Sequence, residues 1–183
     1  DRHLARAFAV AETLTSDLAA ETDGLLWEHY DESWTHDFEH NRDDPEHTFR
    51  PWGYQPGHHV EWAKLLLLLD RHRSEPWLAR RAGELFDAAV ELGWDEEHGG
   101  FYYTVDLNGD PVVDDKYGWA VAEAIGASAL LREVDDAYDD WYDRLWSYAR
   151  ERFVDRGHGN WYGKLDREGE RPSPNRGVAV EPG

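Results

Sequence analysis

Residues 57–72, GHHVEWAKLLLLLDRH, form an apolar segment of helical length that directly follows Pro56. Proline is favoured in the first turn of an α-helix, so we predict a helix from Gly57 to His72. Its apolar side chains occupy nearly every side: Val60, Trp62, Ala63 and Leu65 to Leu69. A helix that is apolar all round is typically buried on every side, which predicts an inner helix.

Four further segments have helical periodicity, and they are of two types. Residues 117–131 are again apolar nearly all round, whereas residues 4–18, 77–92 and 138–153 each carry one apolar stripe. The order along the chain is therefore outer, inner, outer, inner, outer. A layer of apolar helices inside a layer of amphipathic helices is what an α/α toroid requires.

Each pair of inner and outer helices is followed by a turn-rich segment with strand character. Residues 100–110 are predicted to form a hairpin with an Asn-Gly turn, and residues 160–170 match them in layout. Asp106 corresponds to Asp166, which gives a period of 60 residues. The repeating unit is inner helix, outer helix, hairpin, and such units cannot bury their inner faces alone.

We therefore predict an all-α fold, an (α/α)6 toroid of inner and outer helices with short β-hairpins. The chain is expected to be an incomplete portion of it, because an unpaired outer helix comes first and only two inner helices follow. The absence of Met and the start at Asp1-Arg2-His3 also indicate a processed product or a piece of a longer protein. Residues 1–183 are expected to be a single domain, the middle-to-C-terminal part of the barrel.

The composition excludes several classes of function. Asp and Glu number 39 against 19 Lys and Arg, for a net charge of −20. Phosphate contacts need clustered basic residues, so we expect no nucleic-acid partner and no membrane partner. The absence of Cys excludes disulfides, thiolate zinc sites and cysteine nucleophiles, and the longest apolar run is too short to span a bilayer. We expect a cytoplasmic protein, and its acidic, Lys-poor composition fits a halophilic one that stays hydrated in high salt.

His58 and Glu61 are the residues best suited to chemistry. In a helix that begins at Pro56 they stand at i and i+3 on one face, so the carboxylate can hold the imidazole in one orientation. An oriented histidine is the usual general acid/base, although a purely structural histidine in the first helical turn is the alternative. His59 points about 100° away and is expected to face solvent or to pack.

A metal site is a second interpretation of His58 and Glu61. His36, His40 and His47 lie in the preceding loop and could supply further ligands. No second motif with ligand spacing supports this interpretation, so we expect no metal and no cofactor.

The segment from Glu21 to Gln55 is long for a connection without secondary structure. Its aromatic residues are Trp27, Tyr30, Trp34, Phe38, Phe49, Trp52 and Tyr54. Long loops in compact domains are usually functional or disordered, and this aromatic content argues against disorder. We expect the loop either to plug the end of the helical layer or to take part in binding directly.

The second inner helix offers Trp119 and Glu123. Shifted by the 60-residue period, Trp119 falls next to His59 and Glu123 next to Ala63, so both sites are predicted near the same end of the toroid. A sugar ring can stack on an indole while a carboxylate accepts its hydroxyl hydrogen bonds. The alternative places Trp119 in the core and pairs Glu123 with a backbone donor or an arginine.

Several motifs in a fixed order cover most of the chain. They are Pro56-Gly57-His58-x-x-Glu61-Trp62, Gly99-Gly100-Phe101, Lys116-Tyr117-x-Trp119 with Ala122-Glu123-Ala124, and Gly159-Asn160-Trp161-Tyr162-Gly163 with Asp166. Together they resemble the N-acylglucosamine 2-epimerase family, which includes mannose isomerases, sulfoquinovose isomerases and cellobiose 2-epimerases on an (α/α)6 barrel.

The resemblance implies that His58 is one of two catalytic histidines, that Glu61 is its carboxylate partner in the pocket and that Trp119 contacts the sugar ring. It implies a sugar isomerase or epimerase that moves a proton at C1 and C2 of a mannose, glucose or N-acylglucosamine type of aldose through a cis-enediol. The resemblance also implies that histidines act as acid and base, without metal or nucleotide. The partner would be a small-molecule sugar, and the sequence carries no signal for an oligomeric state.

The chain also departs from the family pattern. The second catalytic histidine belongs to a Tyr-His segment downstream of the Gly-Asn-Trp-Tyr-Gly hairpin, and residues 171–183 contain no histidine. The upstream helices with a pocket arginine and an Asn/His pair are likewise missing. We therefore expect no appreciable turnover from this chain alone. Two other functions stay open: an (α/α)6 glycoside hydrolase, which needs two opposed carboxylates, and a truncated carbohydrate-binding module.

Overall fold

The computed structural model describes residues 2–171. Its α-helices are α1 (Arg2–Glu12), α2 (Pro56–His72), α3 (Pro76–Gly93), α4 (Gly118–Leu131) and α5 (Asp139–Tyr148). Shorter helical turns are η1 (Thr13–Leu18) and η2 (Ala19–Thr22) after α1, η3 (Asp136–Tyr138) before α5 and η4 (Ala149–Phe153) after it. Each predicted helix is present, and Pro56 stands in the first turn of α2 as expected.

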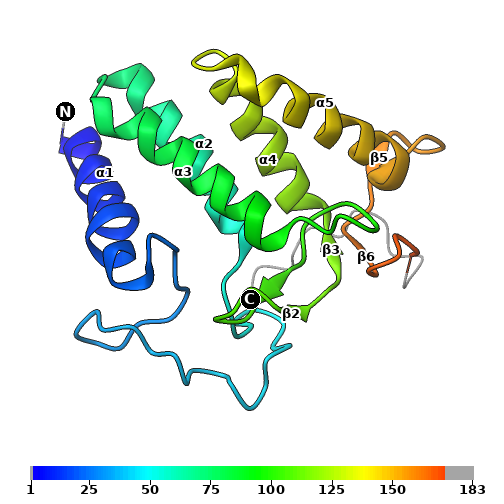
Figure 1. Ribbon diagram of the computed structural model, residues 1–183, viewed down its shortest axis with the longest axis horizontal. Helices are drawn as coiled ribbons and strands as arrows, with labels where there is room; N and C mark the ends of the chain where they lie inside the picture. Colours follow the sequence, from blue (N-terminus) through cyan, green and yellow to red (C-terminus); the bar gives the residue numbers. More distant parts are fainter. Residues whose placement is uncertain (1, 172–183) are drawn as a thin grey trace.

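The two apolar helices lie side by side, and the one-sided helices pack against them. α2 contacts α4, while α1 and α3 pack on α2 and α5 packs on α4 (Figure 1). Fully buried small side chains such as Ala63 and Ala124 allow α2 and α4 to approach closely. The predicted alternation of inner and outer helices is therefore observed.

One detail of the prediction is wrong, because α2 is not buried on every side. Leu65 and Leu68 are 37% and 39% exposed, on a side that the described residues leave open. Periodicity reports how apolar a helix face is, but whether that face is covered depends on which other elements are present.

Short antiparallel strands connect the helices at one end of the molecule. The pairs are β1 (Thr104–Val105) with β2 (Pro111–Val113), β3 (Lys116–Tyr117) with β6 (Lys164–Leu165), and β4 (Val154–Asp155) with β5 (Asn160–Trp161). The β1–β2 pair is the predicted first hairpin. The predicted second hairpin keeps its turn, but its strand β6 pairs with β3, just before α4, instead of with the residues that follow the turn.

The 60-residue period is nevertheless present in the backbone hydrogen bonds. The turns after Asp106 and Asp166 are closed alike: the Gly109 amide donates to the Asp106 carbonyl, and the Gly169 amide to the Asp166 carbonyl, both over 3.1 Å. Val105 bridges Tyr54 just before α2, as Leu165 pairs with Lys116 just before α4. The strand before each turn thus pairs with the residues just before one inner helix. The sequence of the hairpin alone could not predict this pairing.

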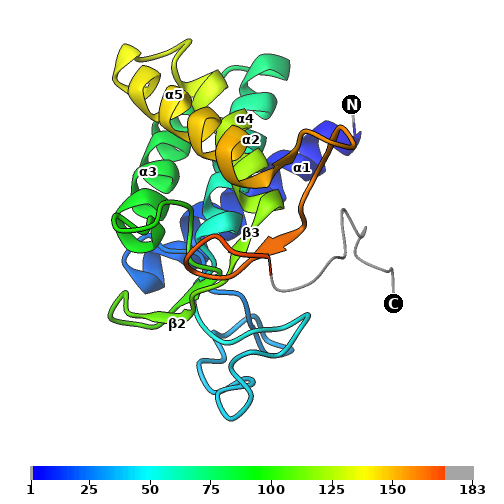
Figure 2. The same ribbon diagram turned by 90° about the vertical axis from the view of Figure 1, so that its right-hand side faces the viewer.

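These pairings gather the first turns of α2 and α4 and the last turn of α3 at the same end. A Cβ atom on Gly93 would collide with Pro56, so this glycine lets α3 end directly against the start of α2. Figure 2 shows the segment 23–55 extending beyond that end, away from the helices. Within the described residues, no helix is both long enough and apolar enough to cross a bilayer.

Candidate active site

His58 lies in the first turn of α2 and is held by a carboxylate from the long loop. Its Nδ1 atom is 2.8 Å from Oε2 of Glu28. Because an ionised carboxylate only accepts hydrogen bonds, Nδ1 carries the proton and Nε2 is the nitrogen available to a substrate. The hydrogen bond that the sequence assigned to Glu61 is thus made by Glu28, since a helix places Glu61 beside His58 but does not aim its carboxylate at the ring.

Glu61 still acts on His58 through its charge. Burial lowers the pKa of the His58 imidazole, but the hydrogen bond and charge of Glu28, with the charge of Glu61, outweigh it. The net result is a pKa above the usual value for histidine. The raised pKa means that the charges of Glu28 and Glu61 favour the protonated form of this imidazole, which is the form that can act as a general acid.

A cavity of about 320 Å³ opens at His58. Its lining comes from the start of the long loop, from α2 and from η1: Leu14, Leu26, Trp27, Glu28, Tyr30, His58, Glu61 and Trp62. An adjoining cavity of about 300 Å³ shares Glu28, Tyr30 and His58 with it. Apolar and aromatic walls with a few converging polar groups are typical of a small-molecule site.

Trp119 lies at the start of α4, next to His58. The ring centroids are 5.2 Å apart with an angle of 38° between the planes. The indole is half-buried and lies outside the buried core. The close approach of α2 and α4 depends on Gly57, where a Cβ atom would stand 2.5 Å from Cη2 of Trp119. The first turns of the two helices thus place an imidazole and an indole side by side.

Glu123 lies one turn further along α4 and forms an ion pair with Lys64 of α2. The sequence predicted a specific partner for this carboxylate, and the structure supplies a lysine where a backbone donor or an arginine was considered. Both side chains are about one quarter exposed, at 26% for Lys64 and 23% for Glu123. The pair links the two inner helices next to Trp119.

His59 is a packing residue and not a solvent-facing one. It is 1% exposed, its Nδ1 lies 2.9 Å from the Gln55 carbonyl, and its Nε2 accepts the Leu26 amide at 3.0 Å. Burial is the main reason why its pKa is lowered to about 4, although the hydrogen bond to Gln55 opposes the shift. His59 is therefore neutral at physiological pH.

The loop histidines of the metal interpretation form no ligand cluster with His58 within the described residues, although His40 lines the cavity next to it. His36 faces Glu21, and His47 Nδ1 accepts the Arg50 amide. The ring of His40 lies against that of His29 at 4.4 Å between centroids, with the planes tilted by 32°. Among residues 2–171, no three His, Cys, Asp or Glu side chains are grouped as metal ligands would be.

The aromatic loop packs as the expected plug and also lines the cavities at His58, while its direct role in binding stays a prediction. Trp27, Trp52 and Tyr54 form a small second core with Val105, so this part of the loop packs against the end of the helical layer. Tyr30 faces the cavities, while other aromatic side chains such as Phe49, 66% exposed, lie at the surface. The loop is thus both a plug and a wall of the site.

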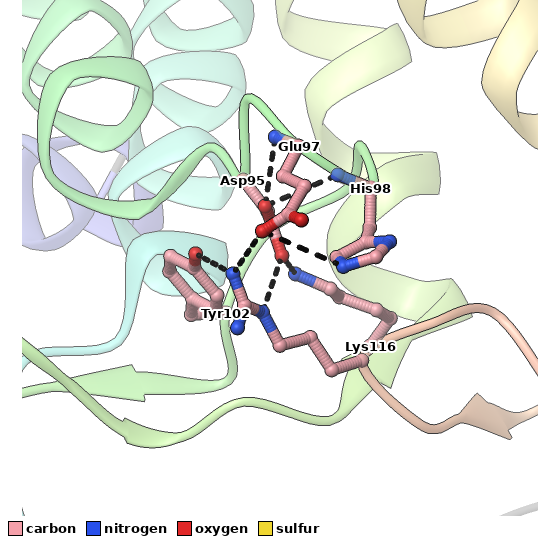
Figure 3. Close-up of polar contacts among 6 residues, drawn as sticks. Asp95, Glu97, His98, Tyr102 and Lys116 are labelled. Atoms are coloured by element: carbon pink, nitrogen blue, oxygen red, sulfur yellow. Dashed lines mark hydrogen bonds and ion pairs between the residues drawn. The ribbon is translucent and has the colours of Figure 1, made fainter.

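A polar cluster around the buried carboxylate of Asp95 ties the connecting segments together (Figure 3). Oδ2 of Asp95 accepts hydrogen bonds from Lys116 Nζ and Arg167 Nε, each over 3.0 Å. Asp95 is 1% exposed and the Lys116 side chain is fully buried, with its ammonium 4.0 Å from the ring centroid of Tyr102. Lys116 lies two residues before the start of α4, so the cluster holds the segment that leads into the helix carrying Trp119.

Comparison with known proteins shows the family of the chain. The family profile described as N-acylglucosamine 2-epimerase (GlcNAc 2-epimerase) matches residues 1–177. The chain belongs to the N-acylglucosamine 2-epimerase family. The D-mannose isomerase of Marinomonas mediterranea is 38% identical over 181 residues, which cover 97% of this chain and 46% of that protein. The D-mannose isomerase of Thermobifida fusca is 40% identical over 166 residues, 88% of this chain and 41% of that protein.

A solved structure supports the same membership. A crystal structure of D-mannose isomerase superposes with a TM-score of 0.93 at 38% identity, covering 96% of this chain and 46% of that chain. The chain thus spans less than half the length of the epimerase-family relatives it matches. The predicted fold, a partial (α/α)6 toroid of inner and outer helices with short strands, is confirmed.

In this epimerase-family chain, sequence reasoning missed Glu28 and Lys64. Glu28 is separated from His58 by an irregular loop, so no periodic pattern relates the two. Lys64 lies one turn beyond Val60 in the apolar middle of α2, and a largely covered lysine there needs a counter-charge. That rule, applied to both inner helices together, would have suggested its pairing with Glu123.

The contact between Gly57 and Trp119 gives a first prediction for the epimerase-family site. Gly57→Ala should displace the indole from His58, because the new Cβ would also stand 2.9 Å from the Cβ of Ala120. In the intact gene product, we expect kcat/KM on a sugar substrate to fall about tenfold, in line with the cost of overpacking a tight contact.

Gly163→Ala is the matched control, because a Cβ atom there meets nothing within 4 Å. It should leave kcat/KM unchanged. Equal losses in the two variants, measured by steady-state kinetics, would show that the approach of α2 to Trp119 does not matter for the site.

Proposed function

We propose that the protein is a sugar isomerase or epimerase that acts at C1 and C2 of an aldose, with D-mannose as the first candidate substrate. The observation that carries the proposal is the His58 imidazole at the cavity wall, oriented by Glu28 and next to the indole of Trp119. Family membership supports it, and the names of the relatives point to D-mannose.

In the proposed reaction, Nε2 of His58 exchanges a proton with the open-chain sugar. Removal of the proton from C2 and protonation of the carbonyl oxygen at C1 give a cis-enediol. Return of a proton to C1, with loss of the proton on the C2 hydroxyl, gives the 2-ketose. Return to the opposite face of C2 gives the epimer. Epimerisation needs a second proton donor on that face, which the family resemblance assigns to a histidine other than His58.

The other residues have supporting roles in this proposal. The indole of Trp119 offers a flat face for the C–H groups of the sugar. Glu61 adds negative charge next to His58, and Glu123, neutralised by Lys64, offers an acceptor for a hydroxyl group. We also propose that residues 1–183 are one domain, and that the protein is cytoplasmic and salt-adapted; these points are supported by composition and periodicity.

Deuterium incorporation tests the proposal. The intact gene product and residues 1–183 are each incubated with D-mannose in D₂O, and the products are followed by ¹H NMR. Isomerisation should yield the 2-ketose with deuterium at C1, whereas epimerisation should yield the C2 epimer with deuterium at C2. We expect conversion by the intact gene product and none by residues 1–183 alone.

The alternatives predict other results in the same assay. A glycoside hydrolase would release sugar from a glycoside and continue to do so after His58 is replaced. A carbohydrate-binding module would bind D-mannose in a calorimeter without converting it. Failure of the intact gene product to convert D-mannose, D-glucose or an N-acylglucosamine would overturn the proposal.

A further inference from the structure

The two adjacent histidines at the start of α2 both hold the beginning of the long loop. His58 contacts the side chain of Glu28, and His59 accepts the backbone amide of Leu26. Between these two contacts lies Trp27, which is 3% exposed and packs edge-on against Tyr54 at 5.0 Å between ring centroids. Residues 26–28 are thus fixed from both sides.

The hydrogen bonds of His59 define its chemical state. The Gln55 carbonyl can only accept, so Nδ1 of His59 carries the proton, and Nε2 must be unprotonated to accept the Leu26 amide. Both ring nitrogens are engaged, and the side chain is buried. His59 is therefore unable to exchange protons with a substrate in the cavity.

A second anchor lies just upstream of these contacts. The Arg81 guanidinium, from α3, donates to the Gly24 carbonyl and, through Nε at 2.5 Å, to the Thr15 carbonyl. The loop is therefore attached to α3 at residue 24 and to α2 at residue 26. Each anchor restricts the loop backbone, so less conformational entropy is lost when Glu28 binds His58.

We infer that His59 is a positioning residue for His58: it holds the backbone of Leu26 on the first turn of α2, so that the carboxylate of Glu28 meets Nδ1 of His58. This inference rests on the proposed function of His58. A free loop would bring Glu28 to His58 only part of the time, because ordering the loop backbone and the Glu28 side chain costs conformational entropy. With Leu26 fixed, the pairing is preorganised.

The charged and titratable groups around His58 determine how its pKa would respond to a change in Glu28. Glu28 approaches from the loop and Glu61 from α2 itself, while Tyr30, His29, His40 and Arg50 line the adjoining cavity. The Glu28 carboxylate is the group bonded to the ring. Displacing it leaves the effect of burial in place, so the pKa of His58 should fall.

Three substitutions at His59 test the inference, because they differ in which of its two hydrogen bonds, to Gln55 or to Leu26, they can keep. His59→Gln reaches the position of Nε2 and can accept the Leu26 amide. His59→Asn reaches only the position of Nδ1, and His59→Phe fills the space without polar atoms. In the intact gene product we expect His59→Phe and His59→Asn to lower kcat about 10- to 100-fold with a smaller change in KM, and His59→Gln to retain most of kcat.

A readout independent of activity accompanies the kinetics. NMR titration of the His58 imidazole should show a lower pKa in His59→Phe than in the wild type, and the same direction in Glu28→Gln. Glu28→Gln leaves the buried bonds of His59 intact, so it keeps the test valid if His59→Phe does not fold. Glu32→Gln is the control, because it makes the same carboxylate-to-amide change at an exposed position of the same loop. It should change neither kcat nor the pKa of His58.

The double variant His59→Phe/Glu28→Gln decides whether His59 acts through Glu28. If it does, the double variant loses no more kcat than the more impaired single variant. Independent losses that multiply, or equal kcat in His59→Gln and His59→Asn, would overturn the inference. Unchanged kcat and unchanged His58 pKa in a folded His59→Phe would do so as well.

The outcomes separate this inference from the proposed function. If the intact gene product converts no sugar while His59→Phe still lowers the pKa of His58, the proposed function fails and the positioning stands. If the wild type is active and depends on His58, but the His59 variants are fully active, the positioning fails alone.

Discussion

His58→Asn should lower kcat for D-mannose conversion by the intact gene product about 10²- to 10⁴-fold, the usual contribution of a general acid/base. The asparagine amide occupies the position of Nδ1 and can still donate to Glu28, which lies 2.8 Å from that nitrogen in the wild type. The nitrogen that would exchange the proton is lost, however. Steady-state kinetics with NMR detection of the product measures the effect, and the thermal midpoint should change little.

His72→Asn is the matched control, because His72 is exposed at the other end of the same helix. It should retain full activity. A His58→Asn variant with more than one tenth of the wild-type kcat would show that His58 is not the acid/base of the reaction. The same loss in His72→Asn would indicate a general defect of α2.

Asp95→Asn should destabilise the fold by about 3–5 kcal/mol, because it leaves the charge of Lys116 buried without its partner. The side chains of Asp95 and Lys116 are 1% and 0% exposed. Asparagine keeps an oxygen for the amides of Glu97 and His98, which Oδ1 of Asp95 accepts at 3.0 and 3.2 Å, so the substitution removes mainly the charge. Urea denaturation measures the free energy of unfolding.

Asp115→Asn is the control for this substitution. Asp115 pairs with Lys164 at the surface, where the two side chains are 25% and 41% exposed. Such pairs contribute about 1 kcal/mol or less, so the control should cost little.

The double variant Asp95→Asn/Lys116→Met should be more stable than Asp95→Asn, because it removes the unpaired charge. Similar losses at Asp95 and Asp115 would contradict the importance of burial in the cluster.

The pH dependence of this effect follows from the pKa of Asp95. Burial alone would raise the pKa, but hydrogen bonds from Arg167, Lys116 and the His98 amide, with the charge of Lys116, hold it well below its usual range. A lowered folded-state pKa gives stability that is complete above the unfolded pKa, about 3.9, and is lost as the pH falls. The difference in the free energy of unfolding between the wild type and Asp95→Asn should therefore be constant between pH 7 and 5 and shrink below about pH 4.

The fold could be predicted to a large extent because its signals are local and repeated. The apolar run after Pro56 and the one-sided stripe over 77–92 correspond to α2 and α3 within one residue or two. The 60-residue period identified two equivalent turns. The strand pairing was predicted only in part, since β6 finds its partner before α4 and not within its own hairpin. A local sequence pattern shows that a segment can form a strand, but it does not show which distant strand will pair with it.

Helical periodicity alone placed His58 with Glu61, and Trp119 with Glu123, on shared helix faces at one end of the two inner helices. Three contacts emerged only from the folded chain: Glu28 orients His58, His59 holds Leu26, and Lys64 neutralises Glu123. The physical reason is the same in each case. Residues on one helix are related by its fixed rise and twist, whereas these partners come from an irregular loop or from a second helix. Their meeting depends on how the whole chain packs.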